Sequence, residues 1–286
     1  MTGLSLNKKI IAIILIIISS IFDIEADNKK NLIILHLNDT HSQMDPISSH
    51  SDNNPNRGGA IRQNAVIEEL RQLDPDILLF HSGDFVQGTP YFNIFKGQAE
   101  IAIMNLMQYD AICLGNHEFD YGLENLAKMI KAASFPVITT NLDFTNTVLD
   151  NLTHKYFIIH KKNIKIGIIG LTINIKGLTS SANYSGIKLL DPIETANETA
   201  EYLKEKEKCD MIICLSHLGY DPTENKKEDV FLAKNSRNID IILGGHTHTF
   251  LNKADRRYNL DGKEVVINQV GNKGIYIGRL DVILEN

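Results

Sequence analysis

The chain has 286 residues, which is long enough for one large α/β domain or two small ones around a sizeable core. Its formal net charge is −6, its pI is near 5.9, and it contains no long run of lysines or arginines. This balance excludes an extended basic surface of the kind that binds duplex nucleic acid, so no nucleic-acid partner is expected.

The first 26 residues predict a secretory signal. Lys8 and Lys9 precede an apolar run over residues 10–18, which is short for a membrane span because a helix needs about 20 residues to cross a bilayer. Ala26 is the expected last residue of this leader, and residues 27–286 are expected to form one domain. The protein is therefore expected to be secreted or periplasmic. The alternative is an uncleaved leader that anchors it to a membrane.

From residue 32 onward, apolar strands alternate with amphipathic helices. The predicted strands of the first half are residues 32–37, 76–80, 110–114 and 136–140. Apolar residues at helical spacing predict helices over residues 60–73, 98–107 and 123–133. In the first of these helices the apolar positions are Ile61, Ala65, Val66, Leu70 and Leu73. This alternation predicts an α/β domain with a largely parallel sheet.

The second half of the chain predicts a further sheet. Strands over residues 156–160 and 164–171 flank a short polar turn, which is typical of a β-hairpin. Asp191 and Pro192 predict the start of a helix that ends near Lys206. The remaining predicted elements are a helix over residues 226–235 and strands over residues 211–215, 239–243, 264–270 and 274–284.

Several residues carry weaker expectations. His36 and His81 lie within or at the edge of predicted strands and are expected to pack in the core. The polar stretch over residues 48–59, which contains Arg57, is expected to be a solvated loop, and the alternative is a loop that faces a substrate. The three cysteines do not make a disulfide framework.

Five predicted strands end in residues that bind hard or borderline metal ions. These residues are Asp39 and His41, then Asp84, then Asn116 and His117, then His217, and finally His246 and His248. In open α/β sheets the site forms where the carboxyl ends of strands meet loops, so these side chains are expected to converge. A single histidine after a strand is more often a core or surface residue, but the ordered set of five favours a metal site.

The charges of this set suit two metal ions better than one. Two divalent ions bring four positive charges, and the carboxylates of Asp39 and Asp84 return two negative charges. A bridging hydroxide would return one more and leave the site near +1, which suits an incoming phosphate ester. Two ions about 3.5 to 4 Å apart can share one carboxylate.

The motifs Asp-x-His, Gly-Asp, Gly-Asn-His-Glu, Ser-His and Gly-His-x-His together resemble those of the calcineurin-like metallophosphoesterases. The longer stretches over residues 37–42 and 115–122 resemble the branch that contains secreted 5′-nucleotidases and UDP-sugar hydrolases. The resemblance extends over about residues 32–284. It implies an α/β fold, namely a four-layer α/β/β/α sandwich with two mixed sheets.

The resemblance also implies a role for each site residue. One divalent ion would be held by Asp39, His41, Asp84 and His248, and the other by Asp84, Asn116, His217 and His246. His117 would be a catalytic residue off the metals that stabilises or protonates the phosphate, and Asp120 would orient it. Asn116 and His117 would contact the substrate. Some members of this branch have an amide in place of His248, so the resemblance leaves the identity of the metal open among Zn, Mn, Co, Fe and Mg.

The implied function is an exported phosphoesterase that hydrolyses nucleoside 5′-monophosphates, by attack of a metal-bridging hydroxide with His117 and Asp120 assisting. The alternatives are a phosphodiesterase or pyrophosphatase acting on cyclic nucleotides or nucleotide sugars, and a catalytically silent metal-binding subunit. In the resembled 5′-nucleotidases, a C-terminal domain supplies arginines and aromatic residues for the nucleotide. That domain does not follow here, so a separate chain that carries it is an expected partner, and unaided action on small phosphate esters is the alternative.

Overall fold

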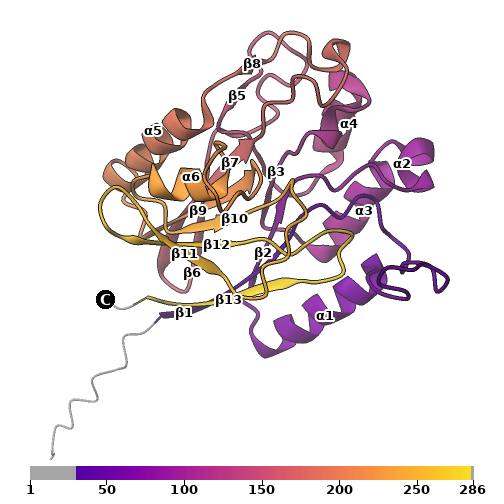
Figure 1. Ribbon diagram of the computed structural model, residues 1–286, viewed down its shortest axis with the longest axis horizontal. Coiled ribbons are helices and arrows are strands. Elements are labelled where there is room, and N and C mark those ends of the chain that lie inside the picture. The colour runs from indigo at the N-terminus through magenta and orange to yellow at the C-terminus, as the bar shows by residue number, and fades with distance from the viewer. Residues whose placement is uncertain (1–29, 285–286) are drawn as a thin grey trace, which may run out of the picture.

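The computed structural model of the protein describes residues 30–284 (Figure 1). The predicted leader, residues 1–26, lies outside the described residues. Within residues 30–284, none of the helices has the length and apolar character needed to cross a membrane.

The first sheet is built by the amino-terminal half of the chain and by the last strand. Its strands, in spatial order, are β13 (Gly278–Leu284), β1 (Lys30–Leu37), β2 (Leu78–Ser82), β3 (Ala111–Cys113) and β4 (Val137–Ile138). Strands β1 to β4 are parallel, and β13 pairs antiparallel with β1. The connecting helices are α1 (Ala60–Leu73), α2 (Pro90–Phe95), α3 (Gln98–Met107) and α4 (Gly122–Ala132).

The second sheet is built by the carboxy-terminal half. Its strands, in spatial order, are β11 (Asp255–Tyr258), β12 (Glu264–Asn268), β10 (Ile241–Leu243), β9 (Met211–His217), β7 (Ile164–Thr172) and β6 (Phe157–Lys161). The two edge strands β11 and β6 are antiparallel to their neighbours, and the inner four are parallel. Helices α5 (Pro192–Glu205) and α6 (Asp229–Lys234) belong to this half. A small pair, β5 (Leu142–Asp143) and β8 (Lys188–Leu189), forms a separate sheet.

Three apolar clusters hold these layers together. One lies between the first sheet and α1, α3 and α4, and another lies between the second sheet and α5 and α6. The middle cluster joins the two sheets face to face and includes Phe80, Ile166 and Leu243. Figure 1 accordingly shows α5 and α6 on one side of the paired sheets and α1 to α4 on the other. The predicted four-layer α/β/β/α sandwich with two mixed sheets is confirmed.

The start of α5 follows its predicted chemistry. The carboxylate of Asp191 accepts hydrogen bonds from the backbone N–H groups of Ile193 at 3.0 Å and Glu194 at 3.1 Å. Pro192 occupies the first turn, where its missing N–H leaves no unpaired donor.

Helix α1 has the predicted ends but buries a different face. Ile61 and Leu73 are 86% and 79% exposed, whereas Gln63 and Ile67 are buried. The side-chain amide of Gln63 donates to the carbonyl oxygen of Gly274 at 3.1 Å. The inner face of this helix therefore contacts the backbone of the segment before β13 as well as the apolar sheet, and that contact requires a polar residue.

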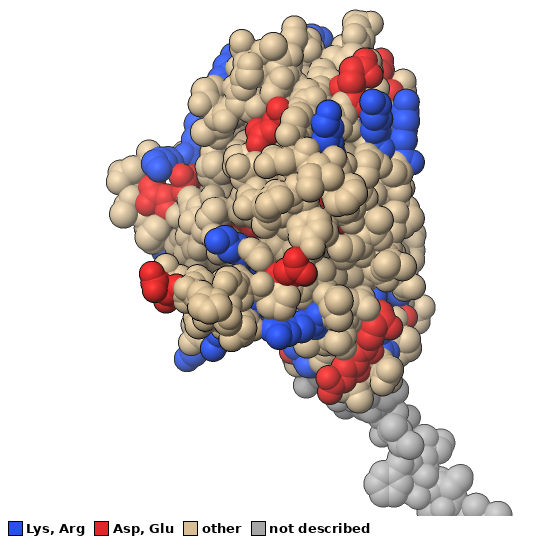
Figure 2. All heavy atoms as spheres, turned by 90° about the vertical axis from the view of Figure 1, so that its right-hand side faces the viewer, with Lys and Arg blue, Asp and Glu red and all other residues tan. Residues whose placement is uncertain are grey.

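Other boundaries differ from the predictions in ways that have a local cause. Strand β2 begins two residues later than expected and includes His81 and Ser82, because its pairing with β3 continues to Ser82. Residues 274–277 were expected in the last strand but precede it. The short elements α2, β5, β8 and β11 were not predicted, since each spans too few residues to show a period in the sequence. On the face shown in Figure 2, acidic and basic side chains form small mixed groups separated by uncharged surface.

Candidate metal centre

The loops that follow the strands of both sheets meet at one place. The loop after β1 runs beside the loop after β2, with backbone hydrogen bonds from Asp39 to Gly83 at 3.0 Å and from His41 to Asp84 at 3.1 Å. The loop after β10 joins them, because the backbone N–H of His246 donates to the Asp39 carboxylate at 3.0 Å. The predicted convergence of the strand ends is therefore present.

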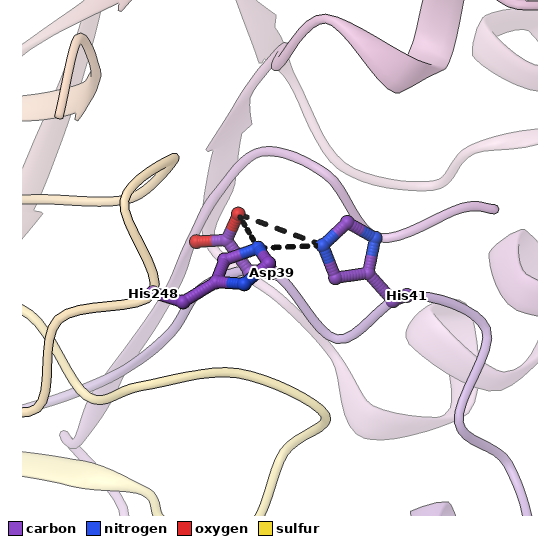
Figure 3. Close-up of side chains that lie close together, drawn as sticks. All are labelled: Asp39, His41 and His248. Atoms are coloured by element: carbon purple, nitrogen blue, oxygen red, sulfur yellow. Dashed lines mark hydrogen bonds and ion pairs between the residues drawn. The ribbon is translucent and has the colours of Figure 1, made fainter. Parts of the chain in front are cut away.

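Asp39, His41 and His248 form the first group of facing ligand atoms (Figure 3). Asp39 Oδ1 lies 3.3 Å from His248 Nε2 and 3.8 Å from His41 Nε2. The two Nε2 atoms are 2.9 Å apart. Asp39 is fully buried, so its charge has little contact with water. These three side chains point at one small volume and could hold a metal ion.

Asp84, His217 and His246 form a second such group. His217 Nε2 lies 3.1 Å from Asp84 Oδ2, and both residues are buried. The amide oxygen of Asn116 lies 3.0 Å from His246 Nδ1, which brings this predicted ligand to the same group. Asp84 also faces His41 and His117, so it lies between the two groups.

The hydrogen bonds behind two histidines leave their inner nitrogens free for a metal. His217 Nδ1 lies 2.6 Å from the carbonyl oxygen of Ser82, and His41 Nδ1 lies 3.3 Å from that of Val86. A carbonyl only accepts, so each Nδ1 carries the proton and a neutral ring presents a lone pair at Nε2. With the proton on Nδ1, the Nε2 lone pair of a neutral His217 ring faces Asp84 Oδ2 at 3.1 Å. A buried lone pair aimed at a carboxylate fits a cation between them.

His248 is held by a different contact. The side-chain nitrogen of Asn272 lies 2.8 Å from His248 Nδ1, and in this orientation the amide donates to the ring. The proton of a neutral ring then sits on Nε2, where it can donate to His41 Nε2. A metal ligand needs the opposite tautomer, which a 180° turn of the Asn272 amide would support by presenting its carbonyl oxygen to Nδ1.

The carboxylates attract positive charge to the centre. Burial disfavours the charged form of His217, but Asp84 and Asp39 outweigh burial and raise the pKa of His217 to about 10. Burial and the neighbouring His217 lower the pKa of His246 to about 4. Protons and metal ions therefore compete for the same atoms in this centre.

His117 and Asp120 form a pair beside the two groups. His117 begins the short helical turn η1 (His117–Phe119) after β3, and its Nδ1 lies 2.7 Å from Asp120 Oδ2. Its backbone N–H donates to Asp84 Oδ1 at 2.9 Å. Burial alone would lower the pKa of His117, but the hydrogen bond to Asp120 and the charge of Asp84 raise it above its usual value. The ring nitrogen Nε2 is left for a ligand.

Five of the seven predicted ligands have left-handed backbone conformations, which are unfavourable for residues other than glycine. The φ angles are 50° for Asp39, 50° for His41, 54° for Asp84, 76° for His246 and 55° for His248. The hydrogen bonds between the loops must hold these conformations in place. Backbone strain of this kind is common at functional sites.

Glu118 holds two of these loops together, a role that the sequence did not reveal. Its buried carboxylate accepts hydrogen bonds from the N–H groups of Gly115 at 2.6 Å, Phe85 at 2.9 Å and Asp84 at 3.1 Å. Burial and the nearby charge of Asp84 raise the pKa of Glu118 to about 7. Its place directly after His117 was the only signal available.

Gln269 supports the loop after β10 in a similar way. Its side-chain N–H donates to the carbonyl oxygen of Gly245 at 2.7 Å, and its oxygen accepts from the hydroxyl of Thr247 at 3.0 Å.

The two histidines expected in the core, His36 and His81, are both fully buried. His81 Nε2 lies 3.1 Å from the hydroxyl of Thr40, next to the metal centre.

Comparisons with known proteins agree with this geometry. A family model described as calcineurin-like phosphoesterase matches residues 32–250. The snake venom 5′-nucleotidase of Crotalus adamanteus is 33% identical over 275 residues, which span 89% of this chain and 45% of that protein. The NAD 5′-nucleotidase of Haemophilus influenzae is 34% identical over 230 residues, which span 78% of this chain and 37% of that protein.

Among solved structures, a 5′-nucleotidase precursor from Thermus thermophilus superposes with a TM-score of 0.81 at 31% identity. The match covers 88% of this chain and 51% of that one. The chain thus spans about half the length of this structure, and less than half of the two relatives above.

Proposed function

Since the chain belongs to the calcineurin-like phosphoesterases, we propose that it hydrolyses phosphate monoesters with the help of two divalent metal ions. The observation that carries this proposal is the pair of ligand groups that meet at Asp84. Nucleoside 5′-monophosphates are the proposed substrates, because the relatives that match the chain are named as 5′-nucleotidases.

Each metal ion would have four protein ligands. The first set is Asp39, His41, Asp84 and His248, and the second is Asp84, Asn116, His217 and His246. The grouping of the ligand atoms and the Nε2 lone pairs that His41 and His217 turn toward the centre support this division. When bound, the ions polarise the phosphate and lower the pKa of the attacking water.

His117 would handle the proton of the reaction. Its Nδ1 is fixed against Asp120 at 2.7 Å, which sets the direction of the ring. The raised pKa of His117 favours the protonated form, so Nε2 can donate to the phosphate or to the leaving oxygen. Asp120 would keep the ring in this orientation and stabilise its charge, while Asn116 and His117 would contact the substrate.

The organisation around this domain is also a proposal. Residues 27–286 would act as the catalytic domain, exported by the leader over residues 1–26. A nucleotide-specificity domain on a separate chain is proposed as a partner, and support comes from the relatives, of which more than half lies outside the matched region.

A metal analysis combined with a substrate panel tests the activity. We expect two bound ions per chain and turnover of AMP that disappears with a chelator and returns with added Mn²⁺ or Zn²⁺. UDP-glucose, cyclic AMP and p-nitrophenyl phosphate complete the panel, and preferred hydrolysis of cyclic AMP would indicate a phosphodiesterase. Asp84→Asn should remove activity, whereas His50→Ala, in an exposed loop, should not. Two bound ions without hydrolysis of any ester would indicate a silent metal-binding subunit.

A further inference from the structure

A groove of about 440 Å³ lies between the start of α1 and the segment that precedes β13. Arg57, Gly58 and Arg62 line one wall, and Gly274, Ile275 and Tyr276 are among the residues of the other. None of these side chains belongs to the metal centre described above.

The groove is joined to the metal centre by short contacts. The backbone N–H of Lys273 donates to the carbonyl oxygen of Asp39 at 2.7 Å, and Asn272 contacts the ring of His248. Gly58 packs so closely on this segment that a Cβ at position 58 would lie 2.9 Å from the carbonyl oxygen of Lys273. Asn272 and Lys273 therefore contact residues of the first ligand group and directly precede Gly274 in one wall of the groove. Gly58 in the other wall packs against Lys273.

The two arginines of the groove, Arg57 and Arg62, differ from the other arginines in their lack of a carboxylate partner in the described part of the chain. The sequence contains seven arginines, and all lie within the described residues. Five have a carboxylate oxygen within 4.0 Å, namely Arg71, Arg237, Arg256, Arg257 and Arg279. Within residues 30–284 only Arg57 and Arg62 lack such a partner, and Arg62 donates to the carbonyl oxygen of Asn56. In a chain with a net charge of −6, two guanidinium groups without a carboxylate partner in that range make this groove locally suited to an anion.

Tyr276, which lines the groove, belongs to an aromatic pair with Phe250. The rings of Tyr276 and Phe250 stack with centroids 4.2 Å apart and planes inclined by 24°. Tyr276 is 38% exposed and Phe250 is 46% exposed, so the pair keeps ring surface in contact with solvent. Phe250 follows His248 by two residues. Exposed aromatic rings of this kind are platforms on which a nucleic-acid base can stack.

We propose that this groove is a substrate subsite in which Arg57 and Arg62 bind a second, non-reacting phosphate of a nucleotide and the Tyr276–Phe250 pair supports the base. Planar guanidinium groups match phosphate oxygens, and an aromatic face matches a purine or pyrimidine. The subsite rests on the proposed function, because the reacting phosphate would lie at the metal centre. It would favour nucleoside diphosphates over monophosphates and over small esters.

Steady-state kinetics with the full chain test the arginines. ADP supplies a non-reacting phosphate, AMP has only the reacting one, and glycerol phosphate lacks the base. In the double variant Arg57→Ala/Arg62→Ala we expect kcat/KM for ADP to fall at least tenfold, while kcat/KM for glycerol phosphate changes less than twofold. The matched control is Arg237→Ala/Arg256→Ala, whose arginines already have carboxylate partners. An unchanged ADP to glycerol phosphate ratio would overturn the subsite.

A binding measurement separates this inference from the activity itself. The chain contains no tryptophan, so Tyr276→Trp places a single tryptophan in the groove, which can be excited at wavelengths where tyrosine does not absorb. We expect ADP to quench this fluorescence, and the quenching to weaken at least tenfold in apparent affinity when Arg57 and Arg62 are also replaced by alanine. Failure of the proposed function would appear as no hydrolysis of glycerol phosphate by the wild type. Absence of quenching by ADP would refute the subsite whether or not the chain is active.

Discussion

His117 and Asp120 contribute to the site through one hydrogen bond. The 2.7 Å contact between Nδ1 and Oδ2 fixes the ring and raises the pKa of His117. The neighbouring residue Asn116 points instead toward His246. Two adjacent residues on one loop thus face different partners, which is the physical basis for giving them different roles.

Replacing His117 tests its role apart from metal binding. His117→Ala should lower kcat by about 10² to 10⁴, the usual contribution of a positioned acid or base, with both metal ions retained. Steady-state assays and metal analysis of the same sample measure both quantities. His160→Ala, at an exposed position of β6, serves as the control and should keep full turnover. If kcat of His117→Ala equals that of the wild type, the assigned role is wrong.

A second residue-scale effect concerns stability. His36 is fully buried in β1, neither ring nitrogen has a hydrogen-bond partner among the described residues, and burial lowers its pKa from 6.5 to about 4. In the unfolded chain His36 takes up a proton below pH 6.5, whereas the folded chain does not until about pH 4. As the pH falls from 6.5 to 4, the free energy of unfolding should therefore decrease by up to about 1.4 kcal/mol per pH unit.

The variant His36→Leu should lose this part of the pH dependence. Urea unfolding at several pH values between 4 and 7, with chelator in every sample, gives the difference between variant and wild type. As the pH falls from 7 to 4, we expect the free energy of unfolding of the variant to rise by about 3 kcal/mol relative to that of the wild type. Parallel pH curves for the two proteins would show that burial of His36 has no such effect, and His160→Leu provides the exposed comparison.

At the scale of elements, the site depends on how loops are tied at the ends of short strands. Strand β3 has only three residues, and the loop after it carries Asn116 and His117. Glu118 connects this loop to the one after β2 by accepting from Gly115, Asp84 and Phe85. The left-handed conformation of Asp84 therefore depends on a side chain from the loop after β3.

Removing the Glu118 carboxylate should loosen both loops. Glu118→Ala leaves three buried N–H groups without an acceptor, and each such group costs about 1–3 kcal/mol. We expect a loss of several kcal/mol in the free energy of unfolding together with weaker metal binding, measured by urea titration and by calorimetry. Glu118→Gln keeps one acceptor oxygen and should lie between Ala and wild type. Glu124→Ala, exposed on α4, is the matched control, and equal effects of the two alanine variants would contradict this role.

At the scale of the whole molecule, each ligand group draws on both sheets. Asp39, His41 and Asp84 follow strands of the first sheet, whereas His217, His246 and His248 come from the second. The apolar cluster between the sheets holds the two halves face to face. A metal ion bound by either group would therefore link the two halves of the chain, and the folded state would gain stability from binding.

Metal removal should thus destabilise the whole molecule. At a free metal concentration of 1,000 times Kd, binding to the folded state alone adds about 4 kcal/mol. We expect the thermal midpoint to fall after chelation and to recover with added metal, as measured by calorimetry. Asp84→Asn, which alters the ligand that we propose both metal ions share, should show a smaller shift, and His50→Ala should show the full one. A midpoint that is unchanged after the metal is stripped would disprove this coupling.

Local patterns in the sequence determined much of the fold. Apolar runs and helical spacing gave the bounds of α1 and α3, and the chemistry of Asp191 and Pro192 gave the start of α5. The motifs at the strand ends identified the residues that converge, because parallel strands of one sheet place their carboxyl ends along one edge. These features depend on neighbours in the chain, so the sequence was sufficient.

Only the tertiary structure decided which side chains meet across distant segments. The buried face of α1 follows from the contact between Gln63 and Gly274, which are more than two hundred positions apart. The role of Glu118 requires the loop after β2 to lie beside it, and Arg57 acquires its proposed role only because Tyr276 forms the opposite wall of its groove. Burial and hydrogen bonding between remote segments set these contacts, and no local period in the sequence encodes them.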